Sequence, residues 1–280
     1  MPPLSRRHRE HTTILAGFFV VTSFISDEFG NFSPVSQCDV SFAFPLGQSD
    51  FGKVKPMSKR LMSVVVAFLL CALGTGTANA AAWSSSEKWG SWSNGGYTVR
   101  NNIWGSGAGS QKISADSYRN WTVTANHPNT GGVKSYPHVA KAVNTKISSI
   151  GSLRSSFNVS VPRSGAYATA YDIWLGNNAY EVMLWMNKAG AVGPIGSKQA
   201  TAHVGGHNWD IYRGSNGGNA VFSFVRTSNA NSGTVDIKSV LTWINNRGWY
   251  GDVTLGEIQF GYEITSSSGG LNFSTNGFSV

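Results

Sequence analysis

The stretch YEVMLWM at residues 180–186 could place a reactive carboxylate in a binding site. Its β-branched, aromatic and long apolar residues are typical of a half-buried strand. Because side chains alternate between the two faces of a strand, the face opposite the apolar one carries Glu181, Met183 and Trp185. A carboxylate, a thioether and an indole in a row are unusual for an ordinary solvated surface. We therefore expect this face to line a cleft.

A second stretch, EIQFGYEI at residues 257–264, repeats the arrangement. Its even-numbered residues are apolar, and its other face carries Glu257 and Glu263. Two strands that each carry a carboxylate on the face away from the core suggest a glycosidase cleft, because glycosidases need a pair of carboxyl groups beside the glycosidic bond. Glu181 and Glu263 on neighbouring parts of one sheet would meet that need, whereas Glu257 is interpreted as a surface residue at the strand end.

A third carboxylate, Asp172, belongs to a strand expected over residues 166–175. The turn at 176–178 joins that strand to the one bearing Glu181, so the two should form a hairpin. We expect Asp172 to orient Glu181 and to share a proton with it, with Glu263 facing the pair across the cleft. An ordinary carboxylate facing the turn remains the alternative for Asp172.

Indole rings offer flat apolar faces to the C–H groups of sugars, and three tryptophans are candidates for this role. They are Trp104, Trp174 and Trp185. A place in the hydrophobic core is the open alternative for Trp104 and Trp174.

Composition limits the remaining classes of function. The chain has 280 residues, 12% aromatic and 13% charged residues, and 33 glycines, which fits an all-β domain with many turns. Its net charge is +8, but the basic residues of the body are scattered singly, so no nucleic-acid partner is expected. His203 and His207 are separated by a Gly-Gly pair and have no metal-binding spacing, so neither a metal nor a cofactor is expected.

The N-terminal part carries an export signal. Residues 57–60 are basic, 61–73 are apolar, and 78–80 read ANA, the pattern of a signal-peptidase site. We expect a secretory signal peptide at 57–80, cleaved after Ala80, and no membrane association afterwards; a retained anchor is the alternative. Residues 1–56 are interpreted as an over-extended leader, with translation starting at Met57. Cleavage would remove both cysteines, Cys38 and Cys71, and leave one domain at 81–280.

Short strands dominate this remaining domain. One helix is expected over 236–247, where Val240, Leu241 and Ile244 recur at helical spacing. Residues 81–96 are expected to be a loose N-terminal segment and 190–197 a loop. The predicted fold is all-β, a jelly-roll sandwich of two antiparallel sheets with one helix and a concave substrate cleft. The strands are expected within residues 97–105, 111–126, 132–137, 155–161, 166–175, 180–186, 209–212, 219–226, 254–265 and 271–279.

Several short motifs, taken together and in order, resemble the signature of glycoside hydrolase family 12. They are NNIWG at 101–105, VKSYP at 133–137, YDIW at 171–174, EVMLW at 181–185, PIG at 194–196, FSFV at 222–225 and GYE at 261–263. The resemblance covers residues 97–280 and implies a retaining β-1,4-glucanase with a jelly-roll fold.

By position in these motifs, Glu181 resembles the nucleophile, Glu263 the general acid/base, and Asp172 the carboxylate beside the nucleophile. The resemblance also implies cleft positions for Asn102, Trp104 and Trp185, and places Pro194 in the loop that crosses the cleft; Met183 and Trp174 complete the expected substrate-binding set. Two features depart from many relatives. The domain lacks their N-terminal disulfide, and the turn between Asp172 and Glu181 is shorter.

The sequence therefore predicts a secreted, monomeric endo-β-1,4-glucanase that binds a β-glucan polysaccharide and hydrolyses its internal bonds. One alternative is a xyloglucanase or mixed-linkage glucanase on the same fold, since cleft width is not readable from sequence. Another is a non-catalytic carbohydrate-binding module. Both Glu181 and Glu263 are present, which argues against that second alternative because a binding module has no need of the pair.

Overall fold

The computed structural model describes residues 24–26, 32–34 and 80–280. The first two segments are short strands, β1 (Phe24–Ser26) and β2 (Phe32–Pro34), which pair antiparallel with each other. They belong to a unit separate from the one that holds all later elements. The leader expected at 1–56 and the signal peptide expected at 57–80 lie almost wholly outside the described residues.

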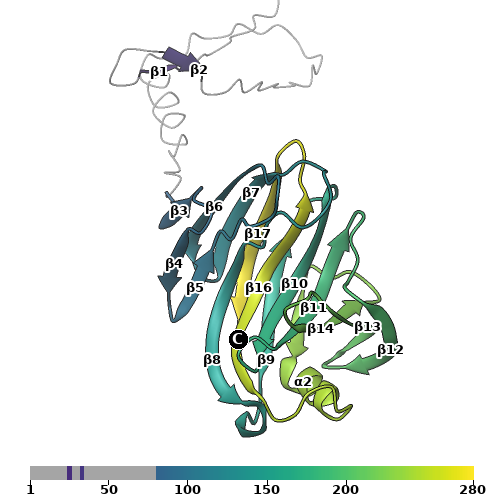
Figure 1. Cartoon of the computed structure of the whole chain (residues 1–280). Helices are drawn as coiled ribbons and strands as arrows, with labels where there is room; N and C mark the ends of the chain where they lie inside the picture. The colour runs from purple at the N-terminus through teal and green to yellow at the C-terminus, as the bar shows by residue number, and fades with distance from the viewer. Residues whose placement is uncertain (1–23, 27–31, 35–79) are drawn as a thin grey trace, which may run out of the picture. The chain divides into compact units, whose positions relative to one another are not determined.

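The second unit is a sandwich of two sheets (Figure 1). Every strand pair in it is antiparallel except β11–β14, which is parallel. The nine-stranded sheet has the order β12 (Ser197–Val204), β13 (His207–Ser215), β14 (Ala220–Arg226), β11 (Tyr180–Ala189), β10 (Ala166–Leu175), β16 (Thr254–Ser266), β8 (His138–Lys146), β5 (Tyr97–Arg100), β4 (Ser91–Asn94). The six-stranded sheet has the order β15 (Ser232–Asp236), β9 (Arg154–Ser160), β17 (Leu271–Ser279), β7 (Asn120–Asn126), β6 (Ser110–Ser117), β3 (Trp83–Ser85). The predicted all-β sandwich is confirmed.

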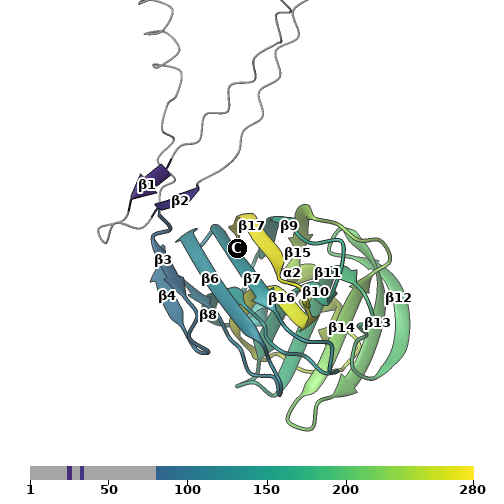
Figure 2. The same ribbon diagram turned by 90° about the horizontal axis from the view of Figure 1, so that it is seen from above.

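Side-chain alternation explains why the sheets stack. In β7 the residues Trp121, Val123 and Ala125 are fully buried, and the residues between them are exposed. Figure 2 shows the strands of the sandwich from above. The side chains on the inward faces of both sheets form one large hydrophobic core. The central strands β10 and β11 are buried on nearly every residue, because their second face is covered as well. That second face of the nine-stranded sheet is where the carboxylates lie.

The second unit contains one α-helix, which follows β15. A short 3₁₀ turn, Ile147–Ser149, lies earlier in the chain, between β8 and β9. The helix, α2, spans Ile237–Asn245, inside the predicted range. Asp236 caps its N-terminus by accepting a hydrogen bond from the Ser239 amide at 3.0 Å. Its buried face, Ile237, Val240, Leu241 and Ile244, packs into the sandwich core.

The structure corrects several expectations for strands. The segment expected to be loose, 81–96, contributes edge strands β3 and β4, and β8, β12 and β15 were not predicted. Residues 132–137, expected as a strand, form only an isolated bridge in which Ser135 pairs with Ile103 and Ile264. The missed strands are polar or exposed on alternate residues, as in the Ser-Lys-Gln-Ala start of β12, so hydrophobic periodicity is weak there. The predicted hairpin of β10 and β11 is confirmed.

Candidate active site

A cleft of about 490 Å³ opens on the face of the nine-stranded sheet that points away from the core. It crosses β16, β10 and β11, with Trp104 toward β5 and with Ile195 and Asn216 toward β12–β14. The lining residues are Asn102, Trp104, Val133, Tyr136, Asp172, Trp174, Asn178, Glu181, Met183, Trp185, Gly193, Ile195, Asn216, Glu257, Gln259 and Glu263.

Glu181 is held at the floor of this cleft by two asparagine side chains. Asn219 donates to Glu181 Oε2 at 2.9 Å, and Asn216 donates to the same oxygen at 3.2 Å. Both asparagines come from the turn between β13 and β14, and β14 lies beside β11 in the sheet. Burial raises the pKa of Glu181 above its ordinary value, while the Asn219 hydrogen bond opposes the shift. Both amide contacts are thus to Oε2 of Glu181, and neither is to Oε1.

Asp172 lies one strand away, on β10. It is buried, and its Oδ1 has no hydrogen-bond partner among the described residues. Burial raises the pKa of Asp172 well above its ordinary value, and the negative charges of Glu181 and Glu263 raise it further. Its burial and its acidic neighbours thus both favour the neutral form of Asp172.

Glu263 enters the cleft from β16, on the other side of β10 from Glu181. Burial raises the pKa of Glu263 to about 7, with a further contribution from the charge of Glu181. A carboxyl group with this pKa is protonated in weakly acidic solution and can give up its proton near neutrality. The cleft therefore combines one carboxyl suited to donating a proton with another whose two amide contacts favour the ionised form.

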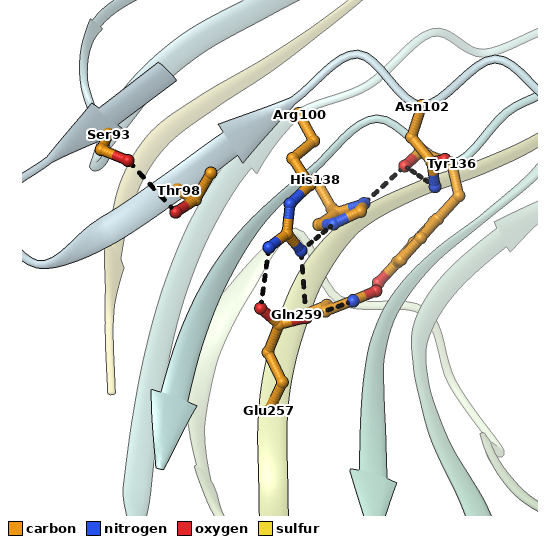
Figure 3. A network of polar contacts seen from close by, with 8 residues as sticks. All are labelled: Ser93, Thr98, Arg100, Asn102, Tyr136, His138, Glu257 and Gln259. Atoms are coloured by element: carbon orange, nitrogen blue, oxygen red, sulfur yellow. Dashed lines mark hydrogen bonds and ion pairs between the residues drawn. The ribbon is translucent and has the colours of Figure 1, made fainter. Parts of the chain in front are cut away.

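Glu257 also lines the cleft and is not the free surface residue that the sequence suggested. Arg100 donates to both of its oxygens at 3.0 Å, and Gln259 donates to Oε2 at 2.7 Å (Figure 3). Burial alone would raise the pKa of Glu257, but the hydrogen bonds from Arg100 and Gln259 outweigh it and lower the pKa. The contacts of Glu257 thus favour its ionised form in the cleft wall.

His138 is buried and contacts Arg100, the partner of Glu257. Its Nδ1 lies 2.7 Å from the Tyr136 carbonyl, which can only accept, so Nδ1 carries the proton. Nε2 then accepts from Arg100 Nη1 at 3.3 Å (Figure 3). Burial lowers the pKa of His138 to about 4, and the Arg100 charge acts in the same direction. Because His138 is neutral, it does not repel the Arg100 guanidinium, whose Nη1 and Nη2 both donate to Glu257.

The aromatic wall of the cleft is built by two loops that brace each other. Asn102 has a left-handed backbone with φ 43°, and its side-chain amide donates to the Tyr136 carbonyl at 3.2 Å. The Tyr136 amide donates back to the Asn102 carbonyl at 2.9 Å, and the Tyr136 hydroxyl donates to the Ala170 carbonyl at 3.0 Å. Beside them, the ring of Trp104 is 51% exposed within the cleft. Trp104 is therefore available to a ligand and is not a core residue.

The loop at 190–196, between β11 and β12, borders the opposite side. Gly193 and Ile195 line the cleft, whereas Pro194 between them is half-buried and is not among the lining residues. Val192 packs on a small apolar cluster formed on the cleft face by Ala168, Ala170, Met183, Trp185, Val221 and Val225. Met183 and Trp185 thus serve partly to seat this loop and partly to line the cleft.

The structure brings together in one cleft all the predicted site residues except Pro194: Asn102, Trp104, Asp172, Trp174, Glu181, Met183, Trp185 and Glu263. Sequence reasoning missed the roles of Tyr136, Asn216, Glu257 and Gln259. The sequence did contain a signal for Tyr136, because this residue lies inside the VKSYP motif. It contained none for Asn216, because the sequence of a polar turn does not reveal which side chain the turn will contact.

Within the described residues no group of three or more His, Cys, Asp or Glu could hold a metal ion. In the same part of the chain, no helix has the length and apolar character needed to cross a membrane.

Comparison with known proteins agrees with this geometry. The model of glycosyl hydrolase family 12 matches residues 95–280. The xyloglucanase domain of NopAA, a type three effector from Sinorhizobium fredii solved in complex with cellobiose, is 44% identical, with a TM-score of 0.69 and coverage of 71% of this chain and 98% of that one. An endo-1,4-β-glucanase and cellulase, CelB2, is 31% identical, with a TM-score of 0.64 and coverage of 70% of this chain and 97% of that one.

A curated relative supports the same assignment. A probable xyloglucan-specific endo-β-1,4-glucanase A from Aspergillus fumigatus is 34% identical over 227 residues, which cover 74% of this chain and 94% of that protein. The chain therefore belongs to glycoside hydrolase family 12.

Proposed function

We propose that this protein is a retaining endo-β-1,4-glucanase in which Glu181 is the nucleophile and Glu263 the general acid/base. The observation that carries the proposal is the contrast between these two carboxyl groups in one cleft. Burial raises the pKa of both, to about 7 for Glu263, but Glu181 also receives two amide hydrogen bonds that favour its ionised form. Retaining hydrolysis needs one ionised and one protonated carboxyl group at the same pH.

In the first step, Glu181 Oε1 attacks the anomeric carbon of the glucosyl unit. The glycosidic C–O bond breaks, and Glu263 gives its proton to the departing oxygen. The products are a covalent glycosyl-enzyme ester, an ionised Glu263 and a shortened glucan with a free hydroxyl.

In the second step, the ionised Glu263 takes a proton from a water molecule, whose oxygen attacks the same anomeric carbon. The ester bond to Glu181 breaks, so Glu181 is again a carboxylate and Glu263 is again protonated. Two inversions give overall retention of configuration.

Asp172 acts through Glu181 and not on the sugar. As a buried neutral acid beside the nucleophile, it can give a hydrogen bond to Glu181, which stabilises the ionised form of that carboxylate. We assign Asp172 as a positioning residue. Trp104 and Trp174 offer the apolar ring faces on which glucosyl units stack.

A xyloglucanase is the second candidate function. The proteins named as relatives include xyloglucan-specific enzymes, and the NopAA domain at 44% identity is described as a xyloglucanase. Cellulose-type and xyloglucan substrates share the β-1,4-glucan backbone and differ in their branches, so the catalytic assignment is the same for both.

We also propose that the enzyme acts as a secreted monomer, made with the signal peptide at 57–80 and trimmed after Ala80. The basic, apolar and small-residue segments of 57–80 support this proposal. N-terminal sequencing of protein recovered from the culture medium tests it, since an N-terminus other than Ala81 would contradict cleavage after Ala80. Elution of the recovered protein as a dimer in size-exclusion chromatography would contradict the monomer.

The experiment that tests the function is reducing-sugar release from soluble cellulose, mixed-linkage glucan and xyloglucan. Glu181→Gln is expected to lower the rate at least about 10³-fold on every substrate that the wild type cleaves. Asp116→Asn, which changes an exposed carboxylate on β6, serves as the control and should keep full activity. Binding of glucans without cleavage by the wild type would instead favour a carbohydrate-binding module, and full activity of Glu181→Gln would contradict the nucleophile.

A further inference from the structure

A second hollow adjoins the cleft and has no part in the mechanism above. This side pocket has a volume of about 460 Å³ and shares Trp174, Asn178 and Glu257 with the cleft. Its remaining lining residues are Ala142, Asn144, Asn177, Thr254 and Gly256. The two hollows are therefore continuous at the row where Trp174 of β10 pairs with Glu257 of β16.

The side pocket extends in a different direction from the cleft. The cleft crosses the strands, from Trp104 toward Ile195 and Asn216. The side pocket instead follows β16 back toward its first residue: Glu263, Gln259 and Glu257 line the cleft, and then Glu257, Gly256 and Thr254 line the side pocket. A glucan backbone bound across the strands would pass the mouth of the side pocket, and only a substituent on that backbone would enter it.

The walls of the side pocket are held in place by the backbone. The Gly176 amide donates to the Thr254 carbonyl at 2.8 Å, which fixes the β10–β11 turn against the start of β16. Asn144, Asn177 and Asn178 all have left-handed backbones, with φ of 51°, 54° and 65°. Asparagine tolerates this conformation better than most residues. All three of these asparagines line the side pocket.

The carboxylate of Glu257 lies where the side pocket meets the cleft. Arg100 and Gln259 orient the Glu257 carboxylate through hydrogen bonds of 3.0, 3.0 and 2.7 Å, and they lower its pKa (Figure 3). A carboxylate of this kind accepts hydrogen bonds from hydroxyl groups, and the asparagine amides both donate and accept. Beside it, Trp174 supplies an apolar ring face. An indole, amides and one carboxylate suit a neutral sugar and disfavour an acidic one.

We propose that the side pocket binds a neutral glycosyl branch of a substituted β-1,4-glucan while the backbone of the polymer lies in the cleft. This inference rests on the proposed glucanase function. It assigns Trp174 and Glu257 as residues that contact both backbone and branch, and Ala142 and Asn144 as residues that contact the branch alone. Linear glucans leave the side pocket empty.

The test uses two substitutions confined to the side pocket. Ala142→Trp fills the pocket from an exposed position of β8, and Asn144→Gly removes the amide while keeping a residue suited to φ 51°. Thr122→Trp adds the same ring at an exposed position of β7, in the other sheet, and serves as the control. The values of kcat/KM are compared for xyloglucan oligosaccharides and for linear cello-oligosaccharides.

Ala142→Trp is expected to lower kcat/KM for the branched substrate at least about tenfold, and Asn144→Gly severalfold, while linear substrates change less than about twofold. Equal losses on both substrates, or no loss on either, would overturn the branch pocket. Binding by Glu181→Gln, measured by calorimetry with the same oligosaccharides, separates the two proposals. The wild type could fail to cleave any glucan and Glu181→Gln could still bind branched oligosaccharides more tightly than linear ones. Loss of that binding preference on adding Ala142→Trp would then still support the pocket. Equal binding of branched and linear oligosaccharides by Glu181→Gln would overturn it.

Discussion

At the scale of single residues, the chemistry depends on how differently four carboxyl groups of the cleft hold their protons. Burial raises the pKa of Asp172 and of Glu263, whereas the hydrogen bonds from Arg100 and Gln259 lower the pKa of Glu257. Glu181 lies between these extremes, with burial opposed by asparagine. The sequence places all four on one face of a sheet, but only the packing around each one separates their proton affinities.

The pH dependence of activity should report Glu263. In the proposed mechanism the protonated form of Glu263 donates to the leaving oxygen. Because the pKa of Glu263 is about 7, kcat/KM on natural glucans should fall as the pH rises through about 7. Glu263→Gln should lose this alkaline limb and should still release an activated aryl leaving group that needs no proton. An unchanged alkaline limb in Glu263→Gln would mean that another group is the acid.

The Arg100–Glu257 pair should stabilise the fold more than an exposed pair does. Arg100→Met leaves a half-buried carboxylate without its bidentate partner, so we expect a loss of about 2 kcal/mol in the free energy of unfolding. Lys198→Met, which breaks an exposed pair with Asp210, should cost less than about 1 kcal/mol. Denaturant titrations of both variants measure the difference, and equal losses would contradict the account.

At the scale of elements, close backbone contacts position the strands that bear the carboxylates. A Cβ atom at Gly261 would lie 2.0 Å from the Pro137 carbonyl oxygen and 2.8 Å from the Cα of His138. The contact allows the Tyr262 amide to donate to the Pro137 carbonyl at 3.1 Å. β16 therefore approaches the Tyr136 loop closely only because residue 261 is glycine, and Glu263 lies two positions further along.

Gly261→Ala should displace β16 at this contact. We expect it to lower the free energy of unfolding by about 2–3 kcal/mol and to reduce kcat/KM at least tenfold, because Glu263 moves with the strand. Gly251→Ala has no heavy atom within 4 Å of the added methyl and should behave as wild type. Chemical denaturation and initial rates test both, and a fully stable, active Gly261→Ala would refute the role of this contact.

The same scale shows what sequence could and could not predict. Strands with clear alternation or a continuous apolar run, such as β7, β10 and β11, were predicted, and for β11 the face turned to the core was predicted as well. β12 was missed because only every second residue is even partly buried there and no run of apolar residues reveals it. Glu257 was interpreted as a surface residue although it shares a strand face with Glu263, because nothing nearby in the sequence reveals its partner Arg100, which lies 157 residues away in the chain.

At the scale of the whole molecule, buried ionisable groups should limit stability on both sides of neutrality. His138 has a folded pKa of about 4 against an ordinary value of 6.5, so its contribution is present above pH 6.5 and lost as the pH falls toward 4. Glu263 has a folded pKa of about 7 against 4.5, so its contribution is present below pH 4.5 and lost as the pH rises through 7. The raised pKa that suits Glu263 to the proposed acid role thus lowers the stability of the fold in alkaline solution.

Thermal unfolding across pH checks this balance. Glu263→Gln should raise Tm above that of the wild type at pH 8, and the gain should vanish at pH 4, where both proteins carry a neutral group. Between pH 7 and pH 5 the Tm of His138→Gln should decrease less than the Tm of the wild type, whatever the absolute stability of the variant. Parallel curves for all three proteins would show that neither group titrates as the structure indicates.

The most direct test of the catalytic assignment is to trap the glycosyl-enzyme with a 2-deoxy-2-fluoro-β-cellobioside carrying a dinitrophenyl leaving group. The fluorine slows hydrolysis of the ester, and the activated leaving group needs no acid. We expect a mass increase of one fluorocellobiosyl group, located by peptide mapping on Glu181, and no labelling of Glu181→Gln. Labelling of Glu263 or Asp172, or hydrolysis of glucan by Glu181→Gln at the wild-type rate, would contradict the assignment.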